Sequence, residues 1–275
     1  MNRKGITLIE LLVALSVSGI LVAGLYKTFI SQQHTYTVQD QVVDMQQNVR
    51  LAINRMTREL RMAGFGRMGA SDSNFFGAGP INGSNMVLNP GGGGTSLTVV
   101  EAYGQAVTTL APNADGNPPA LGQTYILVND VSGFNTGSKK YICINGTDSV
   151  QIKSINGKQI DLDNKTPLSS TEQHQPGEPV YLIQAITYSI GPSEGKSCLL
   201  RDDHLGAGPQ PVAENVENIE FRNPDGSIPL NPSSACMQVA ITVTTDKTDP
   251  DYKLDGGYRK RTLTSNIQVR NLFFK

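Results

Sequence analysis

The chain has 275 residues, which is enough for one large domain or two small ones. Its formal net charge is −1 and only 17% of its residues are charged, so we expect no polybasic surface and no nucleic-acid partner. The 28 glycines and 15 prolines indicate a chain with many turns.

The first predicted element is an apolar helix close to the N-terminus. Residues 6–26 carry few polar side chains, of which Glu10 is the charged one, and Lys27 closes the run. A helix of about 20 apolar residues crosses a bilayer. The two basic residues that precede the segment predict that residues 1–5 stay in the cytoplasm and that the chain after Lys27 lies outside.

Glu10 separates several interpretations of this segment. A cleaved secretory signal has an apolar core of about 7–15 residues followed by a small-residue cleavage site. A plain membrane anchor is the other simple alternative. Neither explains a carboxylate within the span, because a charge at the centre of a membrane helix costs on the order of 3 kcal/mol and usually has a partner.

The run Gly5-Ile6-Thr7-Leu8-Ile9-Glu10-Leu11-Leu12 closely resembles the class III signal of type IV pilins and type II secretion pseudopilins. The resemblance implies that a prepilin peptidase cuts after Gly5 and N-methylates Ile6, and that the apolar helix stays on the mature protein. It also implies an assembly role for Glu10, whose carboxylate would face the N-terminal amine of a neighbouring subunit. Phenylalanine is common after the cut, so Ile6 is a mild departure.

The helix is predicted to continue beyond the membrane segment, because no proline or glycine occurs between Leu25 and Ala63, and Gly64 follows. We expect one helix over about residues 6–63. Its transmembrane and assembly half covers residues 6–30, and an amphipathic half covers residues 31–66. The second half has an apolar stripe with spacings of mostly three and four residues: Val38, Val42, Met45, Val49, Ala52, Ile53, Met56, Leu60 and Ala63.

The end of this helix reads Arg61-Met62-Ala63-Gly64-Phe65 and resembles the corresponding part of PilW-like minor pilins. Major pilins often carry a helix-kinking proline early in the mature chain, and this helix has none. The resemblance therefore favours a minor subunit over the main fibre subunit.

Residues 67–275 are expected to form an extracytoplasmic β-rich domain. Residues 67–95 predict a loop, and Asn156-Gly157 between two apolar runs predicts a hairpin. The predicted fold class is α+β, a pilin-like fold in which one long N-terminal helix packs on a mostly antiparallel β domain. Its last hundred residues loosely resemble PilW-like and J-type pseudopilin subunits. Strands are expected at residues 96–103, 124–129, 139–144, 150–155, 158–162, 180–190, 197–201, 212–221, 237–244 and 261–269.

Two short motifs match enzyme signatures in residue type but not in the predicted secondary structure around them. Residues 64–69 fit G-x-G-x-x-G, but a helix and not a strand precedes them. Residues 191–195 fit G-x-S-x-G, but they join two predicted strands, so we expect a hairpin loop. We expect no enzyme activity and no cofactor.

Two groups of acidic residues are the candidates for metal binding. Neither has the spacing of a calcium-binding loop, so we interpret their members as solvated turn residues and predict no metal site. The groups are Asp202, Asp203 and His204, and Asp249, Asp251 and Asp255.

The three cysteines, Cys143, Cys198 and Cys236, allow one internal disulfide, and their spacing matches no zinc motif. Outside the membrane the compartment oxidises thiols. We favour the pair Cys198–Cys236, with a bond to Cys143 or buried free thiols as the alternatives.

These observations predict a structural subunit: a minor pilin that primes or caps a type IV pilus. Its expected partners are the prepilin peptidase, other minor and major pilins, and the inner membrane, which it crosses once with its C-terminal domain in the periplasm before it joins the fibre. A J-type pseudopilin of a type II secretion pseudopilus is the first alternative. A membrane-anchored periplasmic hydrolase or binding module is the second.

Overall fold

The computed structural model describes residues 7–65, 87–102, 104–137, 139–163, 168, 173–231 and 234–272. The predicted cut between Gly5 and Ile6 lies outside the described residues, as does most of the predicted loop at residues 67–95. The chain divides into two compact units, Met1–Gln47 with Thr245–Arg259 and Asn48–Thr244 with Lys260–Lys275.

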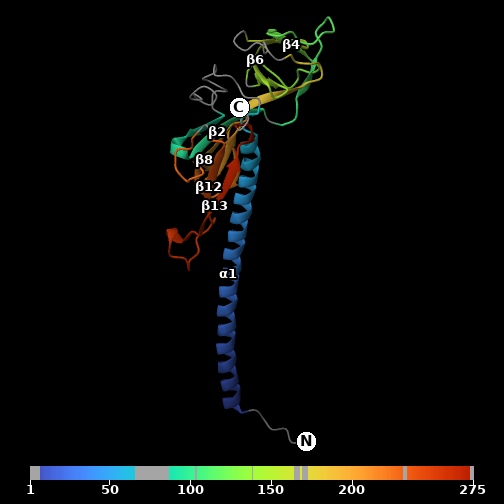
Figure 1. The fold of residues 1–275 in the computed structure, drawn as a ribbon. Coiled ribbons are helices and arrows are strands. Elements are labelled where there is room, and N and C mark those ends of the chain that lie inside the picture. Colours follow the sequence, from blue (N-terminus) through green and yellow to red (C-terminus); the bar gives the residue numbers. More distant parts are fainter. Residues whose placement is uncertain are drawn as a thin grey trace, which may run out of the picture. The chain divides into compact units, whose positions relative to one another are not determined.

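A single helix, α1 (Leu8–Met62), runs for 55 residues and confirms the predicted long N-terminal helix (Figure 1). The helix is followed by Gly64, which has a φ of +83°, a left-handed conformation that glycine adopts readily. The Gly64 N–H donates a hydrogen bond of 2.9 Å to the Val100 carbonyl. The end of the helix is thereby joined to the sheet.

The predicted apolar stripe is buried at the C-terminal end of α1. Val49, Ala52, Met56, Leu60 and Ala63 are each at most 2% exposed. Full burial of a side chain such as leucine or methionine contributes roughly 1.5–3 kcal/mol. Packing of this stripe therefore holds the end of the helix in the second unit.

An antiparallel β domain follows the helix, as predicted. Its described strands form a three-stranded sheet in the order β11-β12-β13 and a ten-stranded sheet. The strands are β1 (Leu88–Gly91), β2 (Ser96–Ala102), β3 (Thr108–Ala111), β4 (Tyr125–Val128), β5 (Tyr141–Ile144), β6 (Asp148–Asn156), β7 (Gln159–Leu162), β8 (Pro179–Ser193), β9 (Lys196–Asp202), β10 (Gln210–Glu214), β11 (Val216–Arg222), β12 (Cys236–Thr244) and β13 (Lys260–Gln268). Short 3₁₀ helices lie at Gly92–Gly94, Asp255–Gly257 and Arg270–Leu272.

Six strands of the larger sheet close into a ring, in the order β8-β3-β4-β7-β6-β5 and back to β8. Figure 1 shows two of them, β4 and β6, in one lobe. Each strand contributes apolar side chains to a common core, so the ring is a small filled barrel. The core includes Leu110, Ile126, Ile142, Ile152, Ile160 and Val180.

Strand β8 belongs both to the barrel and to the open part of the sheet. Its first residues pair with β3 and β5, and its later residues pair with β2 and β9. The chain leaves β2 at Ala102, builds the barrel, and returns along β8 to Ile183, the register partner of Ala102. The barrel is therefore an insertion between two paired strands.

Both predicted hairpins are confirmed. Strands β6 and β7 meet at the pair Asn156 and Gln159, so the turn consists of Gly157 and Lys158, one residue later than the Asn-Gly pattern predicted. Strands β8 and β9 meet at Ser193 and Lys196, which places the G-x-S-x-G sequence in a hairpin.

Two predictions about the β domain are wrong. Residues 212–221 do not form one strand, because Asn215 has a φ of +55° and separates β10 from β11. The two strands then pair in different sheets, with β9 and β12 respectively. Residues 67–95 are not all loop, since Leu88–Gly91 forms the edge strand β1.

Candidate functional site

Thr7 and Glu10 lie together at the N-terminal end of α1. The Thr7 N–H and hydroxyl donate to Glu10 Oε2 at 2.9 and 3.0 Å, and the Glu10 N–H donates to the Thr7 hydroxyl at 3.3 Å. This reciprocal T-x-x-E arrangement is a capping box, which satisfies N–H groups that have no partner within the helix. Glu10 thus has an intramolecular partner. We did not predict it, although the Thr7–Glu10 spacing was the available signal.

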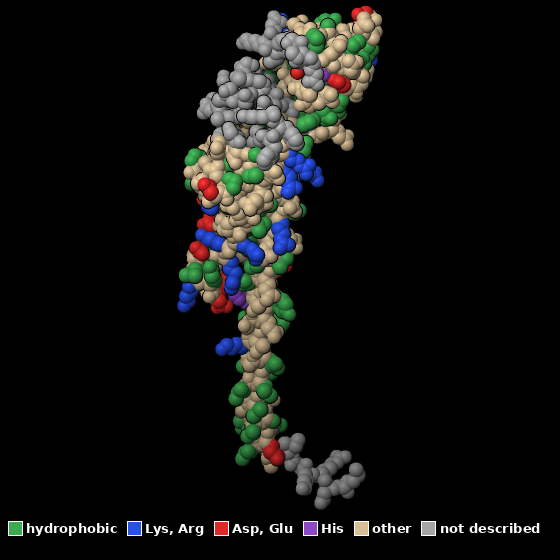
Figure 2. Space-filling model, viewed as in Figure 1, with side chains coloured by type: hydrophobic (Ala, Val, Ile, Leu, Met, Phe, Trp, Pro, Cys, Tyr) green, Lys and Arg blue, Asp and Glu red, His purple; other side chains and the backbone are tan. Residues whose placement is uncertain are grey.

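Apolar side chains surround the first half of α1 and are exposed, and Figure 2 shows them on the visible face of this part of the helix. Among the described residues, one helix, α1, has the length and composition to cross a membrane. Ser16 and Thr28 donate their hydroxyl groups to the carbonyls of Leu12 and Gly24, at 2.9 and 3.0 Å. These polar groups are therefore satisfied within the helix, as a bilayer or a fibre core requires. The exposed set includes Leu8, Ile9, Leu11, Leu12, Leu15, Ile20, Leu21, Val22, Leu25 and Phe29.

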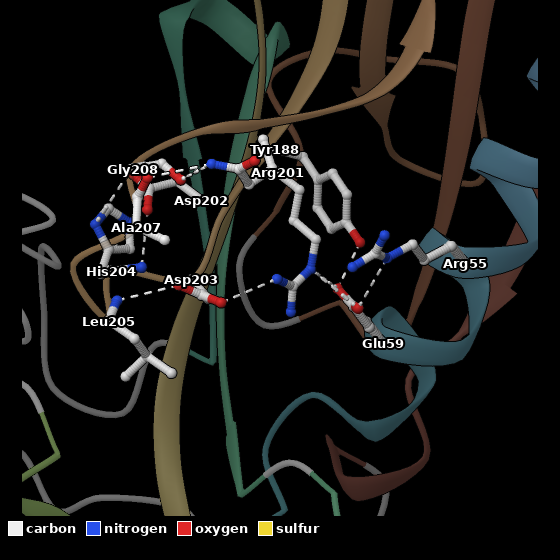
Figure 3. A network of polar contacts seen from close by, with 11 residues as sticks. Arg55, Glu59, Tyr188, Arg201, Asp202, Asp203, His204, Leu205, Ala207 and Gly208 are labelled. Atoms are coloured by element: carbon white, nitrogen blue, oxygen red, sulfur yellow. Dashed lines mark hydrogen bonds and ion pairs between the residues drawn. The ribbon is translucent and has the colours of Figure 1, made fainter.

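A buried polar cluster joins the other end of α1 to the sheet (Figure 3). Arg201 of β9 places its Nε 3.1 Å from both oxygens of Glu59, and the Tyr188 hydroxyl of β8 donates to the same carboxylate at 2.5 Å. Arg55 lies one turn earlier, with its Nε 3.6 Å from Glu59 Oε1. Glu59 is 1% exposed, so any shift of the helix that broke these contacts would leave a buried charge unpaired.

Glu101 of β2 adds a second buried carboxyl group beside this cluster. It is fully buried and, within the part of the chain that the structure describes, neither oxygen has a hydrogen-bond partner. Burial, and next the charge of Glu59, raise the pKa of Glu101 to about 8, although Arg201 acts in the opposite sense. Glu101 is therefore mainly protonated at neutral pH, which limits the negative charge under the helix.

Neither Glu59 nor Glu101 was among the predicted site residues. Glu59 follows Met56 by three residues, so it lies on the apolar stripe of the helix, where a charged residue signals a buried partner. Glu101 ends a strongly apolar run in β2 and gave a similar signal. No comparable signal existed for Arg201, because its partner lies 142 residues away.

His204, a member of the first acidic group, lies close to a hydroxyl group and a carboxylate. Its Nε2 lies 2.8 Å from the Thr187 hydroxyl, and its Nδ1 lies 3.6 Å from Asp202 Oδ2. The order of groups is that of a hydrolase triad, but 3.6 Å is too long for a hydrogen bond. The Thr187 hydroxyl also hydrogen-bonds to Thr98 Oγ1 at 2.7 Å. Since Thr98, Thr187 and Asp202 are register partners on three neighbouring strands, this is a cross-strand polar ladder.

The second acidic group differs from the prediction at one residue. Asp249 is 4% exposed and accepts hydrogen bonds from Arg259, with Nε and Nη2 at 2.8 and 2.6 Å from Oδ2. Its interpretation as a solvated turn residue is therefore wrong. Asp251 and Asp255 are exposed, as that interpretation requires.

The favoured Cys198–Cys236 disulfide is not formed in the structure, in which all three cysteines are free thiols. The two residues belong to different sheets, Cys198 to β9 and Cys236 to β12. Cys143 and Cys198 are buried, which agrees with the alternative of buried free thiols. Burial raises the pKa of the Cys143 thiol to about 11, so this group is unreactive at neutral pH.

Residues 1–26 match the family model described as the prokaryotic N-terminal methylation motif. The chain has no match among the curated proteins or the solved structures. The motif implies processing by a prepilin peptidase and assembly with other pilins, and together with the apolar helix it indicates a membrane-anchored, pilus-related location. A motif of this kind indicates the precursor of a type IV pilin-like protein or pseudopilin and points to a structural role.

Proposed function

We propose that this protein is a minor pilin that primes or caps the assembly of a type IV pilus. The observation that carries the proposal is the methylation motif at the start of a 55-residue helix whose first half is apolar and exposed. Such a surface needs lipid before assembly and neighbouring helices afterwards.

Processing supplies the partner that assembly requires. Cleavage after Gly5 creates an amine on Ile6, and that amine is N-methylated. In the fibre this amine faces Glu10 of a neighbouring subunit, where an ammonium group and a carboxylate attract strongly at low dielectric. Until then, the Thr7 N–H and hydroxyl satisfy Glu10 within its own chain. Assembly thus exchanges an intramolecular partner for an intermolecular one.

The β domain lies in the periplasm while the helix spans the inner membrane, and later on the outside of the fibre, where it selects partner subunits. The buried cluster of Glu59, Tyr188 and Arg201 supports this role, because it fixes the sheet on the end of the helix.

The test is intact mass and N-terminal analysis of the protein isolated from membranes and from sheared fibres. Wild type is expected to begin at N-methyl-Ile6, Gly5→Ala to remain uncut, and Glu10→Ala to be cut but absent from fibres. A mature chain that begins beyond about residue 23, as a signal peptidase would produce, contradicts the proposal.

The same motif serves pseudopilins, so a J-type pseudopilin is the second candidate. Deletion of the gene separates the two. Loss of surface pili with intact protein secretion supports the minor pilin. Loss of secretion with normal pili supports the pseudopilin.

A further inference from the structure

His34 of α1 faces two carboxylates from the loop between β12 and β13, all within the first compact unit. Its Nε2 lies 3.9 Å from Asp249 Oδ1, and its Nδ1 lies 3.7 Å from Asp251 Oδ2. Both distances exceed a hydrogen bond. Among the described residues, no group lies within hydrogen-bond distance of either imidazole nitrogen. Three potential metal ligands therefore converge without direct bonds between imidazole and carboxylate.

Asp249 is held in position to act as a ligand. Arg259 donates two hydrogen bonds to its Oδ2, while its Oδ1 accepts the Asp251 N–H at 3.0 Å and points toward His34. Carboxylates that bind a metal are usually held in place by hydrogen bonds from a second residue, as Arg259 holds Asp249.

We propose that His34, Asp249 and Asp251 bind a divalent transition-metal ion of the zinc type. One imidazole nitrogen with carboxylate oxygens suits such an ion, whereas calcium prefers oxygen ligands alone. The ligand atoms all lie within 4.8 Å of one another. Ligands of a tetrahedral zinc ion are about 3.3 Å apart, so small side-chain rotations close the site. The two carboxylates outweigh the positive charge of Arg259, so the net local charge is negative and favours a cation.

Open space adjoins the three ligands and leaves room for water in the remaining coordination position. A cavity of about 550 Å³ is lined by His34, Val38 and Val42 of the helix and by Asp249, Asp251 and Arg259 of the loop. The bound ion would link the loop to α1 at His34, four residues beyond the predicted transmembrane half. The three ligands come together only when the loop is docked on α1, so ion binding stabilises the docked loop.

The experiment uses the full chain in detergent micelles, freed of metal by a chelator and titrated with Zn²⁺ against a chromophoric competitor. Wild type is expected to bind one ion per chain. His34→Ala and Asp251→Asn are each expected to weaken binding by about tenfold or more. Asp255→Asn, in the same loop but outside the three ligands, is the matched control and should bind as wild type does. Both ligand side chains are partly or fully exposed, so these variants should fold, which circular dichroism verifies.

A second readout is the visible spectrum of the Co²⁺-loaded protein, which should show the absorption of a four-coordinate site in wild type and lose it in His34→Ala. Absence of stoichiometric Zn²⁺ binding overturns the proposal. So does undiminished binding in His34→Ala and Asp251→Asn, which would place the ion on other groups such as the thiols, and so does displacement of Zn²⁺ by equimolar Ca²⁺. None of these outcomes depends on the assignment as a minor pilin.

Discussion

Glu59 and Arg201 lie 142 residues apart in the chain and form a buried ion pair, with the arginine Nε 3.1 Å from both carboxylate oxygens. Glu59 comes from the helix and Arg201 from the sheet. The pair therefore ties the last turns of α1 to the sheet within the second unit.

Removal of Arg201 tests this connection. Arg201→Met leaves Glu59 buried without its main cation, so the free energy of unfolding should fall by about 3–5 kcal/mol. Urea unfolding of the full chain in detergent, followed by near-ultraviolet circular dichroism, measures the loss. Arg55→Met is the matched control: this arginine is about half exposed, and its loss should cost less than about 1 kcal/mol. Equal midpoints for Arg201→Met and wild type would show that the pair does not hold the helix.

Glu101 should make stability fall as the pH rises. Its pKa is about 8 in the folded chain, raised by burial and then by Glu59, against 4.5 for the unfolded group. The folded state therefore binds more protons between these values, and its stability declines across that interval by up to about 1.4 kcal/mol per pH unit. Glu101→Gln removes this term. The variant should match wild type near pH 4 and exceed it increasingly toward pH 8. A constant difference between the two curves would contradict the assignment.

His174 should also make stability fall as the pH rises, in this case because its folded form holds a positive charge. Burial lowers its pKa, but hydrogen bonds to Asp148 and Glu178 at 3.0 and 2.7 Å, and the charges of both, outweigh burial and raise it overall. The stabilisation is complete below the ordinary histidine pKa and is lost as the pH rises through the raised value. His174→Gln should therefore lose about 2–3 kcal/mol at acid pH and progressively less at alkaline pH. His204→Gln controls for loss of an imidazole outside the barrel, and an NMR titration of His174 locates the transition.

Two leucines of α1 distinguish the contribution of side-chain burial to stability from that of helix propensity. Leu60 is fully buried, whereas Leu51 is 66% exposed. Leu60→Ala should destabilise the fold by about 2–5 kcal/mol, while Leu51→Ala should change stability by no more than about 0.5 kcal/mol. Thermal unfolding of the two variants makes the comparison. Similar losses in both would mean that the stripe is not the packed face.

Thr7 and Glu10 test the exchange of partners proposed for assembly. Thr7→Ala removes the hydroxyl of the capping box but leaves the Glu10 carboxylate free to meet a neighbour. We expect Thr7→Ala to enter sheared fibres and Glu10→Ala to stay in the membrane, with both chains cut normally. If both variants were excluded from fibres to the same degree, Glu10 would act through the helix cap alone.

The local features of this fold were predictable because each depends on neighbours in sequence. The apolar segment at the N-terminus and the absence of glycine and proline from Leu25 to Ala63 predicted α1, and the glycine after Asn156 predicted the hairpin between β6 and β7. The closure of the barrel was not predictable in this way, because β5 pairs with β8 across more than thirty intervening residues. Asn215 shows the same limit, since one left-handed residue sends two strands of similar composition to different sheets.

The candidate site divides along the same line. Gly5, Ile6 and Glu10 lie within one stretch of six residues, so residue order alone predicts the roles that we propose for them. Asp249 looked like a turn residue until Arg259, ten positions later, was found beside it. Charged residues that pair across a long sequence separation give only an indirect signal in the sequence, such as the position of Glu59 on an apolar stripe.

The pairing of Ala102 with Ile183 means that the barrel begins and ends at one rung of a hairpin. To the rest of the chain the barrel is an oversized hairpin loop, and lengthening such a loop adds little entropy cost because that cost grows only slowly with loop length. A subunit built in this way can gain, lose or exchange its barrel while the helix and the remaining sheet keep their register. The rung between Ala102 and Ile183 is therefore where a foreign domain could be grafted onto this scaffold with the least disturbance.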